Sequence, residues 1–289
     1  MSKDMERKEG VAISIVMPTY NAGKYIRETV DSIICQSFAD FECIIIDDGS
    51  TDSTCDIICS YDDERIVLIE NRHDFIGSLN IGLETARGKY IARTDADDIM
   101  HPDRLKIQHT IMETEPSITV CSTWMRQFGE KMPAGKIAGS LTGKVEYPLL
   151  AFLQGNFVFH PTTMIRKSFL FEHQLQYENY SHAEDLKLWT EIAKLGGLFY
   201  VENQPLLYYR ISETQVTNQK RDEQKVTAER ILLEIVNYLL DKNKDNFPIL
   251  AESFASLSKL QADNLLDFRE VLDITRRIIL KNKNKLQLS

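Results

Sequence analysis

Apolar runs and helical patterns alternate along the first hundred residues of the chain. Four runs rich in Ile and Val have the length and composition of buried strands: residues 12–18, 41–48, 65–71 and 89–95. Three segments between them place apolar residues at helical spacing: residues 22–36, 49–63 and 76–88. This order predicts a Rossmann-like α/β fold, with a mainly parallel sheet and helices on both faces.

The pattern is less regular from about residue 106 onwards. Helices are predicted at residues 104–116 and 182–197, the second strongly amphipathic. Residues 117–129 predict a strand with a turn, and residues 156–168 predict a strand that runs through His160. Residues 198–212 predict a hairpin-like pair of short strands.

The last seventy residues have a different character. Three helical patterns follow one another there, at residues 223–242, 247–261 and 264–280. Residues 220–289 contain 13 Lys/Arg and 11 Asp/Glu, a net charge of +2, so the first 219 residues carry −11 of the total of −9. We therefore expect two domains, an α/β domain at residues 1–219 and an all-α C-terminal appendage at residues 220–289.

Charge and composition narrow the function classes and the compartment. The net charge of −9 argues against non-specific binding of nucleic acid, which needs a basic surface. An odd number of cysteines, five, suits reduced thiols in the cytoplasm. The polar start has no apolar run like that of a signal peptide, and no window approaches the roughly 18 apolar residues of a membrane span. We expect a cytoplasmic protein that could also lie at the inner face of the plasma membrane.

Polar clusters follow three of the predicted strands. They are "PTYN" after the first strand, "DDGSTD" after the second and "TDADD" after the fourth. Ligands of open α/β sheets bind at the carboxyl ends of the strands, where the crossover loops meet. These three clusters are therefore the first candidates for a binding site.

The acidic residues around Asp97 suggest a metal. Carboxylates this close repel one another unless a cation neutralises them, and oxygen ligands without His or Cys favour Mg²⁺ or Mn²⁺. Such ions usually complete their coordination with phosphate oxygens, so a phosphorylated ligand is expected. The alternative is that Asp97 and Asp98 only cap the helix that begins near Pro102.

The other two clusters allow similar pairs of interpretations. Asp47 and Asp48 end an apolar strand and could bind the imide of a pyrimidine or a ribose hydroxyl, or could be ordinary turn residues. Tyr20 could stack on a base or fill the edge of the sheet. Taken together, the three clusters predict a pocket for a nucleotide diphosphate bridged by a metal.

Glu184 and Asp185 lie at the start of the helix predicted at residues 182–197. The helix dipole favours ionised carboxylates there, and an ionised carboxylate can act as a general base towards a hydroxyl. The alternative is a helix-terminal charge without a chemical role. His160 is either a buried, hydrogen-bonded histidine or, as the minority interpretation, a contact to the acceptor or to a pyrophosphate.

At these residues the chain resembles the inverting nucleotide-sugar glycosyltransferases of family 2, which have the GT-A fold. The resemblance covers roughly residues 11–212 and depends on the order and spacing of "SIVMPTYNAGKYIRETVDSIICQSFADFECIIIDDGSTDST", "GLETARGKYIARTDADD" and "AED". It implies a single-displacement transfer from a nucleotide-diphospho-sugar, with a UDP-sugar favoured, and a Mn²⁺ or Mg²⁺ cofactor. It also implies a saccharide or lipid-linked saccharide acceptor in surface polysaccharide or glycolipid synthesis.

The resemblance assigns roles to particular residues. Catalytic roles fall to Asp185 as the base, with Glu184 beside it. Asp95 would lie towards the ribose and Asp97 would bind the metal, as the two acids of the family's DXD motif. Where relatives often have Ala-Arg-Asn, this chain has Ser-Leu-Asn at residues 78–80, so a basic pyrophosphate contact is absent or comes from Arg72 or Arg93. The nucleotide-binding set comprises Pro18, Tyr20, Asn21, Asp48, Arg72, Arg93, Asp95 and Asp97.

Other functions remain open from the sequence. A sugar-phosphate nucleotidyltransferase would share the sheet and the metal, but it would want a Gly-rich basic loop where "PTYNAGKY" has one Gly and one Lys. An aspartyl phosphotransferase using Asp95 as nucleophile fits poorly with Ile99. A non-catalytic sugar-nucleotide-binding or scaffold protein would not need both Asp97 and Asp185. The basic end, "TRRIILKNKNK", could contact anionic lipid, or the C-terminal helices could form a homodimer.

Overall fold

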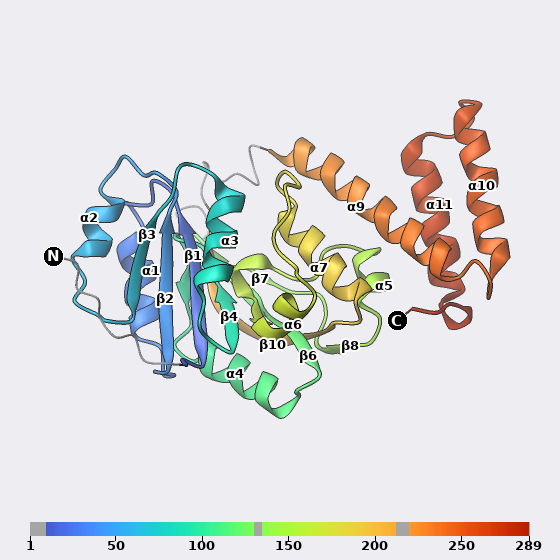
Figure 1. Cartoon of the computed structure of the whole chain (residues 1–289). Helices are drawn as coiled ribbons and strands as arrows, with labels where there is room; N and C mark the ends of the chain where they lie inside the picture. The colour runs from blue at the N-terminus through green and yellow to red at the C-terminus, as the bar shows by residue number, and fades with distance from the viewer. Residues whose placement is uncertain (1–9, 130–134, 212–219, 289) are drawn as a thin grey trace.

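The computed structural model describes residues 10–129, 135–211 and 220–288 (Figure 1). The polar start and the junction before the appendage, residues 1–9 and 212–219, lie outside the described residues. The strands are β1 (Ile13–Thr19), β2 (Phe41–Asp47), β3 (Ile66–Glu70), β4 (Tyr90–Arg93), β5 (Ile99–Met100), β6 (Ile118–Phe128), β7 (Ile137–Ala138), β8 (Gly143–Val145), β9 (Met164–Arg166) and β10 (Leu198–Arg210).

The helices flank this set of strands and extend beyond it. They are α1 (Ile26–Ile34), α2 (Thr54–Cys59), α3 (Phe75–Thr85), α4 (Arg104–Thr114), α5 (Pro148–Phe152), α6 (Lys167–Glu172), α7 (Glu184–Lys194), α9 (Arg221–Lys242), α10 (Pro248–Ala262) and α11 (Phe268–Lys281). Short 3₁₀ turns occur at His160–Thr162 and Lys283–Lys285. Among the described residues the strands form one sheet in the order β3-β2-β1-β4-β9-β6-β10-β5, with β7 beside β6 and β8 beside β10.

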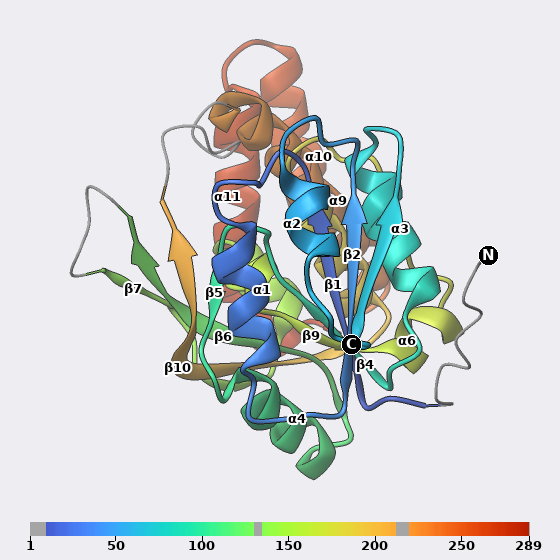
Figure 2. The same cartoon turned by 90° about the vertical axis from the view of Figure 1, so that its left-hand side faces the viewer.

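The first half of the sheet is parallel, as predicted. β1 pairs in parallel with β2 and β4, and β2 pairs in parallel with β3. Side chains of β1 alternate between two cores, with Ile15 and Met17 in one and Val16 in the other. Figure 2 shows α1 and α2 on one side of these strands and α3 on the other. Burial on both faces explains why the strands are continuous apolar runs.

The second half is mixed, and one prediction for it is wrong. The described residues 198–211 do not form the predicted hairpin, because β10 is a single strand of 13 residues that runs parallel to β6. The polar segment around Pro205 resembles a turn in the sequence. In the structure its register shifts between Glu202 and Pro205 and between Pro205 and Leu207, so the strand continues past a residue that has no N–H to donate.

The strand predicted through His160 is also wrong over most of its length. Residues His160–Thr162 form a 3₁₀ turn, and β9 begins only at Met164. Pro161 occupies the first turn of this short helix, where its fixed φ and missing N–H are tolerated. The turn directs His160 into the protein interior.

The three predicted C-terminal helices are present as α9, α10 and α11. The predicted domain limit falls at the undescribed junction, but the hydrophobic core continues past it. Ile231, Ile235 and Leu239 of α9 belong to the same buried cluster as Trp189 of α7. Figure 1 shows α10 and α11 side by side at the far end of α9 from the sheet. Within the described residues, no helix is long and apolar enough to cross a membrane.

Candidate active site

The first polar cluster lies where β1 leaves the sheet. Val16 accepts a hydrogen bond from Thr94 after β4, whereas the carbonyl of Thr19 faces the amide of Asp48 after β2. Backbone groups of alternate residues point to the same side of a strand, so the nitrogen of Pro18, like the carbonyl of Val16, points towards β4. The pairing with β4 ends at Val16, so the missing N–H of Pro18 costs the sheet no hydrogen bond. β1 therefore stays paired with β2 up to Thr19, whereas its pairing with β4 ends at Val16.

Tyr20 and Asn21 follow in that loop. The Tyr20 side chain is 49% exposed and does not fill the sheet edge, so that alternative is wrong. Its ring centroid lies 4.4 Å from that of His73. Asn21 has a left-handed φ of 47°, and its Oδ1 accepts a hydrogen bond from the Thr51 amide at 2.8 Å. The two predicted nucleotide contacts thus stand beside the loop that follows β2.

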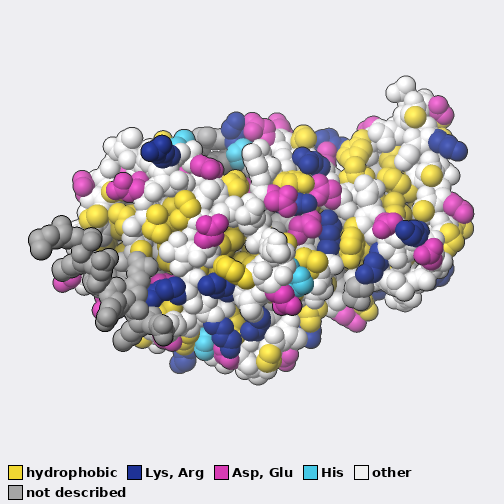
Figure 3. Space-filling model, in the orientation of Figure 1, with side chains coloured by type: hydrophobic (Ala, Val, Ile, Leu, Met, Phe, Trp, Pro, Cys, Tyr) yellow, Lys and Arg dark blue, Asp and Glu magenta, His cyan; other side chains and the backbone are white. Residues whose placement is uncertain are grey.

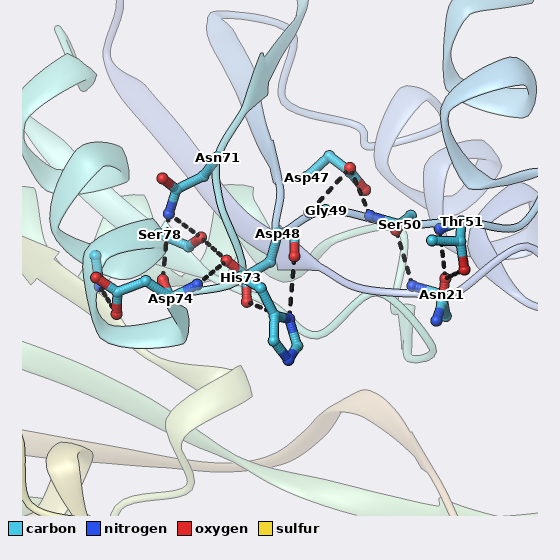
Figure 4. Close-up of polar contacts among 11 residues, drawn as sticks. Asn21, Asp47, Asp48, Gly49, Ser50, Thr51, Asn71, His73, Asp74 and Ser78 are labelled. Atoms are coloured by element: carbon cyan, nitrogen blue, oxygen red, sulfur yellow. Dashed lines mark hydrogen bonds and ion pairs between the residues drawn. The ribbon is translucent and has the colours of Figure 1, made fainter.

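Asp48 is the centre of a hydrogen-bond network between β2 and α3 (Figure 4). Its Oδ1 accepts hydrogen bonds from the Asp74 amide at 2.7 Å and from the Ser78 hydroxyl at 2.9 Å. The side-chain amide of Asn71 donates to the Ser78 hydroxyl at 3.0 Å, and His73 Nδ1 lies 3.6 Å from Asp48 Oδ2. Asp48 is therefore held firmly, with its second oxygen on the side of His73 and Tyr20.

Asp47 differs from its neighbour. Its Oδ2 accepts hydrogen bonds from the amides of Gly49 at 3.2 Å and Ser50 at 2.9 Å. These bonds belong to the turn itself, so local turn chemistry accounts for Asp47. Asp47 is thus a turn residue, whereas Asp48 faces the predicted base pocket.

The second group is an acidic cluster, Asp95, Asp97 and Asp98, in the loop between β4 and β5. Each residue offers a carboxylate oxygen, and these atoms lie within 4.8 Å of one another. Burial, with Asp95 as a second cause, raises the pKa of Asp97 to about 6 and that of Asp98 well above its ordinary value. Asp98 Oδ1 accepts a hydrogen bond from the Arg210 amide at 2.9 Å, whereas its buried Oδ2 has no partner among the described atoms.

Arginines surround the acidic cluster. Arg93 is 4% exposed and its Nη2 lies 2.6 Å from Asp95 Oδ1, while its Nε and Nη1 have no hydrogen-bond partner within the described part of the chain. Arg210 Nε donates to the Asp97 carbonyl at 2.7 Å. Arg104 is fully buried, donates to the Arg93 carbonyl at 2.7 Å, and has its pKa lowered to about 9 by burial.

The helix-capping alternative for these acids is wrong. Helix α4 begins at Arg104 and its cap residue is Asp103, which makes no side-chain capping bond. Asp97 and Asp98 therefore do not cap it. The acidic cluster has the donor set of a hard divalent cation, and the unpartnered oxygen of Asp98 fits the role of a metal ligand. Asp95, Asp97 and Asp98 are the residues that would hold it, a wider set than the single Asp97 predicted from the sequence.

A carboxylate pair, Glu184 and Asp185, forms the start of α7. Burial, with Asp185 as a second cause, raises the pKa of Glu184 to about 7, and burial also raises the pKa of Asp185. Backbone amides at the helix terminus favour the ionised forms, as expected, and lower both pKa values, but burial has the larger effect. Glu184 therefore titrates near neutral pH. Asn156 Nδ2 lies 3.5 Å from Asp185 Oδ2.

His160 is buried and hydrogen-bonded, as the majority interpretation predicted. Its Nε2 lies 2.8 Å from the hydroxyl of Tyr177, and its ring lies edge-on to Trp189 with 5.9 Å between centroids. Burial, and then the charge of Arg93, lowers the pKa of His160 well below its ordinary value. His160 is therefore neutral.

Some of the predicted site residues interact with one another in the structure, and others do not. The charge of Arg93 acts on both acid groups, because it partly opposes the rise that burial causes in the pKa values of Asp97 and Glu184. Arg72 is exposed in the connection between β3 and α3. Sequence reasoning missed Ser78 as the partner of Asp48, and it missed Arg210, which lies in a strand interpreted as a hairpin.

Comparison with known proteins places the chain in a family. The sequence model described as "Glycosyl transferase family 2" matches residues 14–173. An "Uncharacterized glycosyltransferase" of Haemophilus influenzae is 35% identical over 293 residues, covering 89% of this chain and 90% of the relative. The "Putative teichuronic acid biosynthesis glycosyltransferase TuaG" of Bacillus subtilis is 31% identical over 219 residues, covering 74% of this chain and 85% of the relative.

Solved structures agree in fold. The S. aureus protein TarS, residues 1–349 in complex with UDP-GlcNAc, superposes with a TM-score of 0.64 at 21% identity, covering 79% of this chain and 66% of that chain. The mannosyltransferase PcManGT of Pyrobaculum calidifontis, in complex with GDP-Man and Mn²⁺, gives 0.60 at 17% identity, covering 93% and 81%. Both likenesses confirm the predicted GT-A fold. The chain belongs to glycosyl transferase family 2 and is a glycosyltransferase.

Proposed function

We propose that this enzyme is a metal-dependent inverting glycosyltransferase that moves a sugar from a nucleotide-diphospho-sugar to a hydroxyl acceptor. A UDP-sugar is the favoured donor. The observation that carries the proposal is the presence of two acid groups of different kinds, the acidic cluster and the carboxylate pair, with the buried Arg93 acting on both. A donor site and a base are the two parts that a single displacement needs.

The carboxylate pair supplies the base. Of the two carboxylates, we assign the ionised form to Asp185, and it takes the proton of the acceptor hydroxyl. The acceptor oxygen then forms a bond to the anomeric carbon while the bond from that carbon to the diphosphate oxygen breaks, and the diphosphate leaves with the electron pair. Because a single displacement attacks from the face opposite the leaving group, the anomeric configuration inverts.

The donor binds along the ends of β1, β2 and β4 in this proposal. Asp48, held by Ser78, accepts from the base ring, and Tyr20 lies against its face, with Pro18 and Asn21 shaping the loop. Asp95 lies towards the ribose.

The diphosphate lies at the acidic cluster. A divalent cation, Mn²⁺ or Mg²⁺, would be held by Asp97 with its neighbours and would supply positive charge to the diphosphate. The two free donors of Arg93, rather than the exposed Arg72, are the better placed to add a basic contact.

The acceptor is proposed from relatives and from surface chemistry. TuaG is named for teichuronic acid biosynthesis, which supports a saccharide or lipid-linked saccharide acceptor in surface polysaccharide synthesis. Figure 3 shows hydrophobic side chains at the surface over the C-terminal helices, where Ile249 and Leu265 are 56% and 70% exposed. With the exposed Lys281 and Lys283, residues 220–289 are proposed as an appendage that contacts anionic lipid at the inner membrane face, or as a homodimer contact.

The first test is thermal stabilisation by UDP, GDP and dTDP, each with and without Mn²⁺, on the wild type and on Asp97→Ala. We expect one nucleotide, UDP, to raise the melting temperature only with Mn²⁺ and only in the wild type. At a ligand concentration of about 100 times Kd, binding adds about 2.7 kcal/mol to the free energy of unfolding. A shift that is equal in Asp97→Ala, or no shift with any nucleotide, contradicts the proposed donor site.

A further inference from the structure

The turn that leads into α7 contains a residue in a left-handed backbone conformation. The Ala183 amide donates to the Tyr180 carbonyl at 2.9 Å, which closes a β-turn over Ser181 and His182. His182, the third residue of this turn, has a φ of 61°. A positive φ at this position usually belongs to Gly or Asn, because larger side chains make it less favourable. The conformation of His182 therefore depends on contacts that hold it.

One such contact comes from α9, which lies much later in the chain. The side chain of Gln224 donates from Nε2 to the His182 carbonyl at 2.8 Å, across a separation of 42 residues. That carbonyl belongs to the peptide unit that joins His182 to Ala183, and Ala183 is the N-cap residue of α7. The hydrogen bond from Gln224 therefore holds the peptide unit that directly precedes the helix.

Glu234, also on α9, contacts the chain on both sides of this peptide unit. Its Oε1 accepts the hydroxyl hydrogen bond of Tyr180 at 2.8 Å, and its Oε2 accepts from Lys187 Nζ at 2.8 Å. The carboxylate pair begins α7 at Glu184 and Asp185, between these two contacts. The pair therefore lies in a segment that α9 contacts before and after it.

We propose that Gln224 is a positioning residue for glycosyl transfer, whose hydrogen bond holds the left-handed turn at His182 and thereby sets the place of Glu184 and Asp185. The inference depends on the role of Asp185 as the base in the proposed function. It gives α9 a part in catalysis, although the sequence predicts this helix only as a piece of a C-terminal appendage.

The place of the carboxylate pair matters because general-base catalysis depends on distance. A base works within about 2.6–3.2 Å of the hydroxyl, and a displacement of about 1 Å can cost about 10²-fold in rate. The acidic cluster and Asp48 follow β4 and β2, whereas Gln224 contacts the start of α7. Loss of the Gln224 bond should therefore slow turnover and leave nucleotide binding unchanged.

The experiment compares Gln224→Met with Tyr238→Phe. Methionine has a similar length and helix propensity but no N–H to donate. Tyr238, also on α9, donates its hydroxyl hydrogen bond to the carbonyl of Lys194, the last residue of α7, at 2.9 Å. Each variant therefore loses one bond from a side chain of α9 to a backbone carbonyl, but only Gln224→Met loses it beside the carboxylate pair.

Three quantities are measured on each full-length variant. They are hydrogen exchange of the Ala183 and Lys187 amides in the free enzyme, the melting temperature with and without UDP and Mn²⁺, and UDP release from UDP-glucose, UDP-galactose and UDP-GlcNAc. The two amides donate to the Tyr180 and Ala183 carbonyls at 2.9 and 3.0 Å, so their exchange reports on the turn and on the start of α7.

The two variants should differ in exchange and in turnover. For Gln224→Met we expect about fivefold faster exchange of both amides, UDP release slower by about fivefold or more, and unchanged stabilisation by UDP. For Tyr238→Phe we expect the wild-type exchange of both amides and the wild-type rate of UDP release.

A second substitution tests the turn itself. Glycine adopts a positive φ without steric cost, so His182→Gly in the Gln224→Met enzyme should return exchange and UDP release to within about twofold of the wild type. This change also removes the 3.4 Å contact between His182 Nε2 and the exposed Glu223, a surface pair of small energetic weight.

Three outcomes overturn the proposal. Gln224→Met could keep wild-type exchange at both amides, Tyr238→Phe could slow UDP release equally, or His182→Gly could bring no recovery. A wild type that binds no nucleotide, or releases no UDP from these sugars, counts against the proposed UDP-sugar transfer instead. The exchange of the two amides then still decides whether Gln224 holds the turn.

Discussion

The acidic cluster and the carboxylate pair are made of the same chemical group but lie in different surroundings. The acidic cluster lies in a loop after a strand, faces two arginine side chains, and keeps one buried carboxylate oxygen without a partner. The carboxylate pair begins a helix, and its described side-chain contact is the amide of Asn156. Burial raises pKa values in both groups, but the acidic cluster also has the oxygen donors that suit a divalent cation, whereas we expect the carboxylate pair to offset its burial by protonation alone.

The largest effect that would test this contrast is expected from Asp185→Asn. The amide keeps the shape and the contact with Asn156 but cannot take a proton, so turnover should fall by about 10²- to 10⁴-fold. UDP stabilisation with Mn²⁺ should remain, because the acidic cluster is intact. The matched control is Asp273→Asn, an exposed acid paired with Arg276 on α11, which should keep wild-type turnover. Unchanged turnover in Asp185→Asn would remove Asp185 from the mechanism.

A smaller effect is expected in the pH dependence of stability. The pKa of Glu184 is raised to about 7 in the folded protein, above its unfolded value of about 4.5, so its stabilising contribution is complete below pH 4.5 and is lost as the pH rises through 7. Each unit of pKa difference corresponds to about 1.4 kcal/mol. Glu184→Gln, which resembles the protonated acid, should match the wild type near pH 4.5 and melt several degrees higher at pH 8.

The control for this change is Glu223→Gln. Glu223 is exposed, pairs with Lys220 at 2.7 Å, and has a lowered pKa. Its replacement should bring no gain at pH 8. If Glu184→Gln melts no higher than the wild type at pH 8, the carboxylate pair does not keep a proton and the contrast with the acidic cluster fails.

The smallest effect concerns Asp48, a buried carboxylate that already has its donors. Ser78→Ala removes one of the two hydrogen bonds to Asp48 Oδ1, worth about 1 kcal/mol, and should weaken UDP binding about fivefold. Isothermal titration with UDP and Mn²⁺ measures the change. Ser256→Ala on α10, whose hydroxyl donates to the Glu252 carbonyl, should bind UDP like the wild type. Equal affinities for both variants would mean that Ser78 does not orient Asp48 for binding.

The parallel half of the fold could be predicted because each of its strands is buried on both faces. Such strands are continuous apolar runs that end in polar loops, and the sequence displays both features. The polar segment in β10 could not be interpreted in the same way. Its place in a strand depends on pairing with β6, which lies about eighty residues earlier in the chain. The local pattern of apolar and polar residues does not indicate so distant a pairing.

Of the candidate site, the sequence could predict only those residues that lie in short motifs. Asp48, Asp97 and Asp185 each belong to such a motif. Ser78 donates to Asp48, Arg210 donates to Asp98 beside Asp97, and Asn156 donates to Asp185. These donors come from other elements, and hydrogen bonding to a distant carboxylate leaves no periodicity in a sequence. The raised pKa of Glu184 could not be predicted for a related reason, since burial is a property of the packed molecule and not of a helix position.

The last strand has a consequence for the order in which the enzyme is completed during synthesis. Arg210, at the end of β10, provides the amide bonded to Asp98 and is 112 residues further along the chain. At roughly 5–20 residues per second, translation takes on the order of ten seconds to cover that stretch. The early strands can pair on the ribosome in that time, but Asp98 still lacks its donor. A nascent chain can therefore pair its early strands before the hydrogen bonds of its acidic cluster are complete.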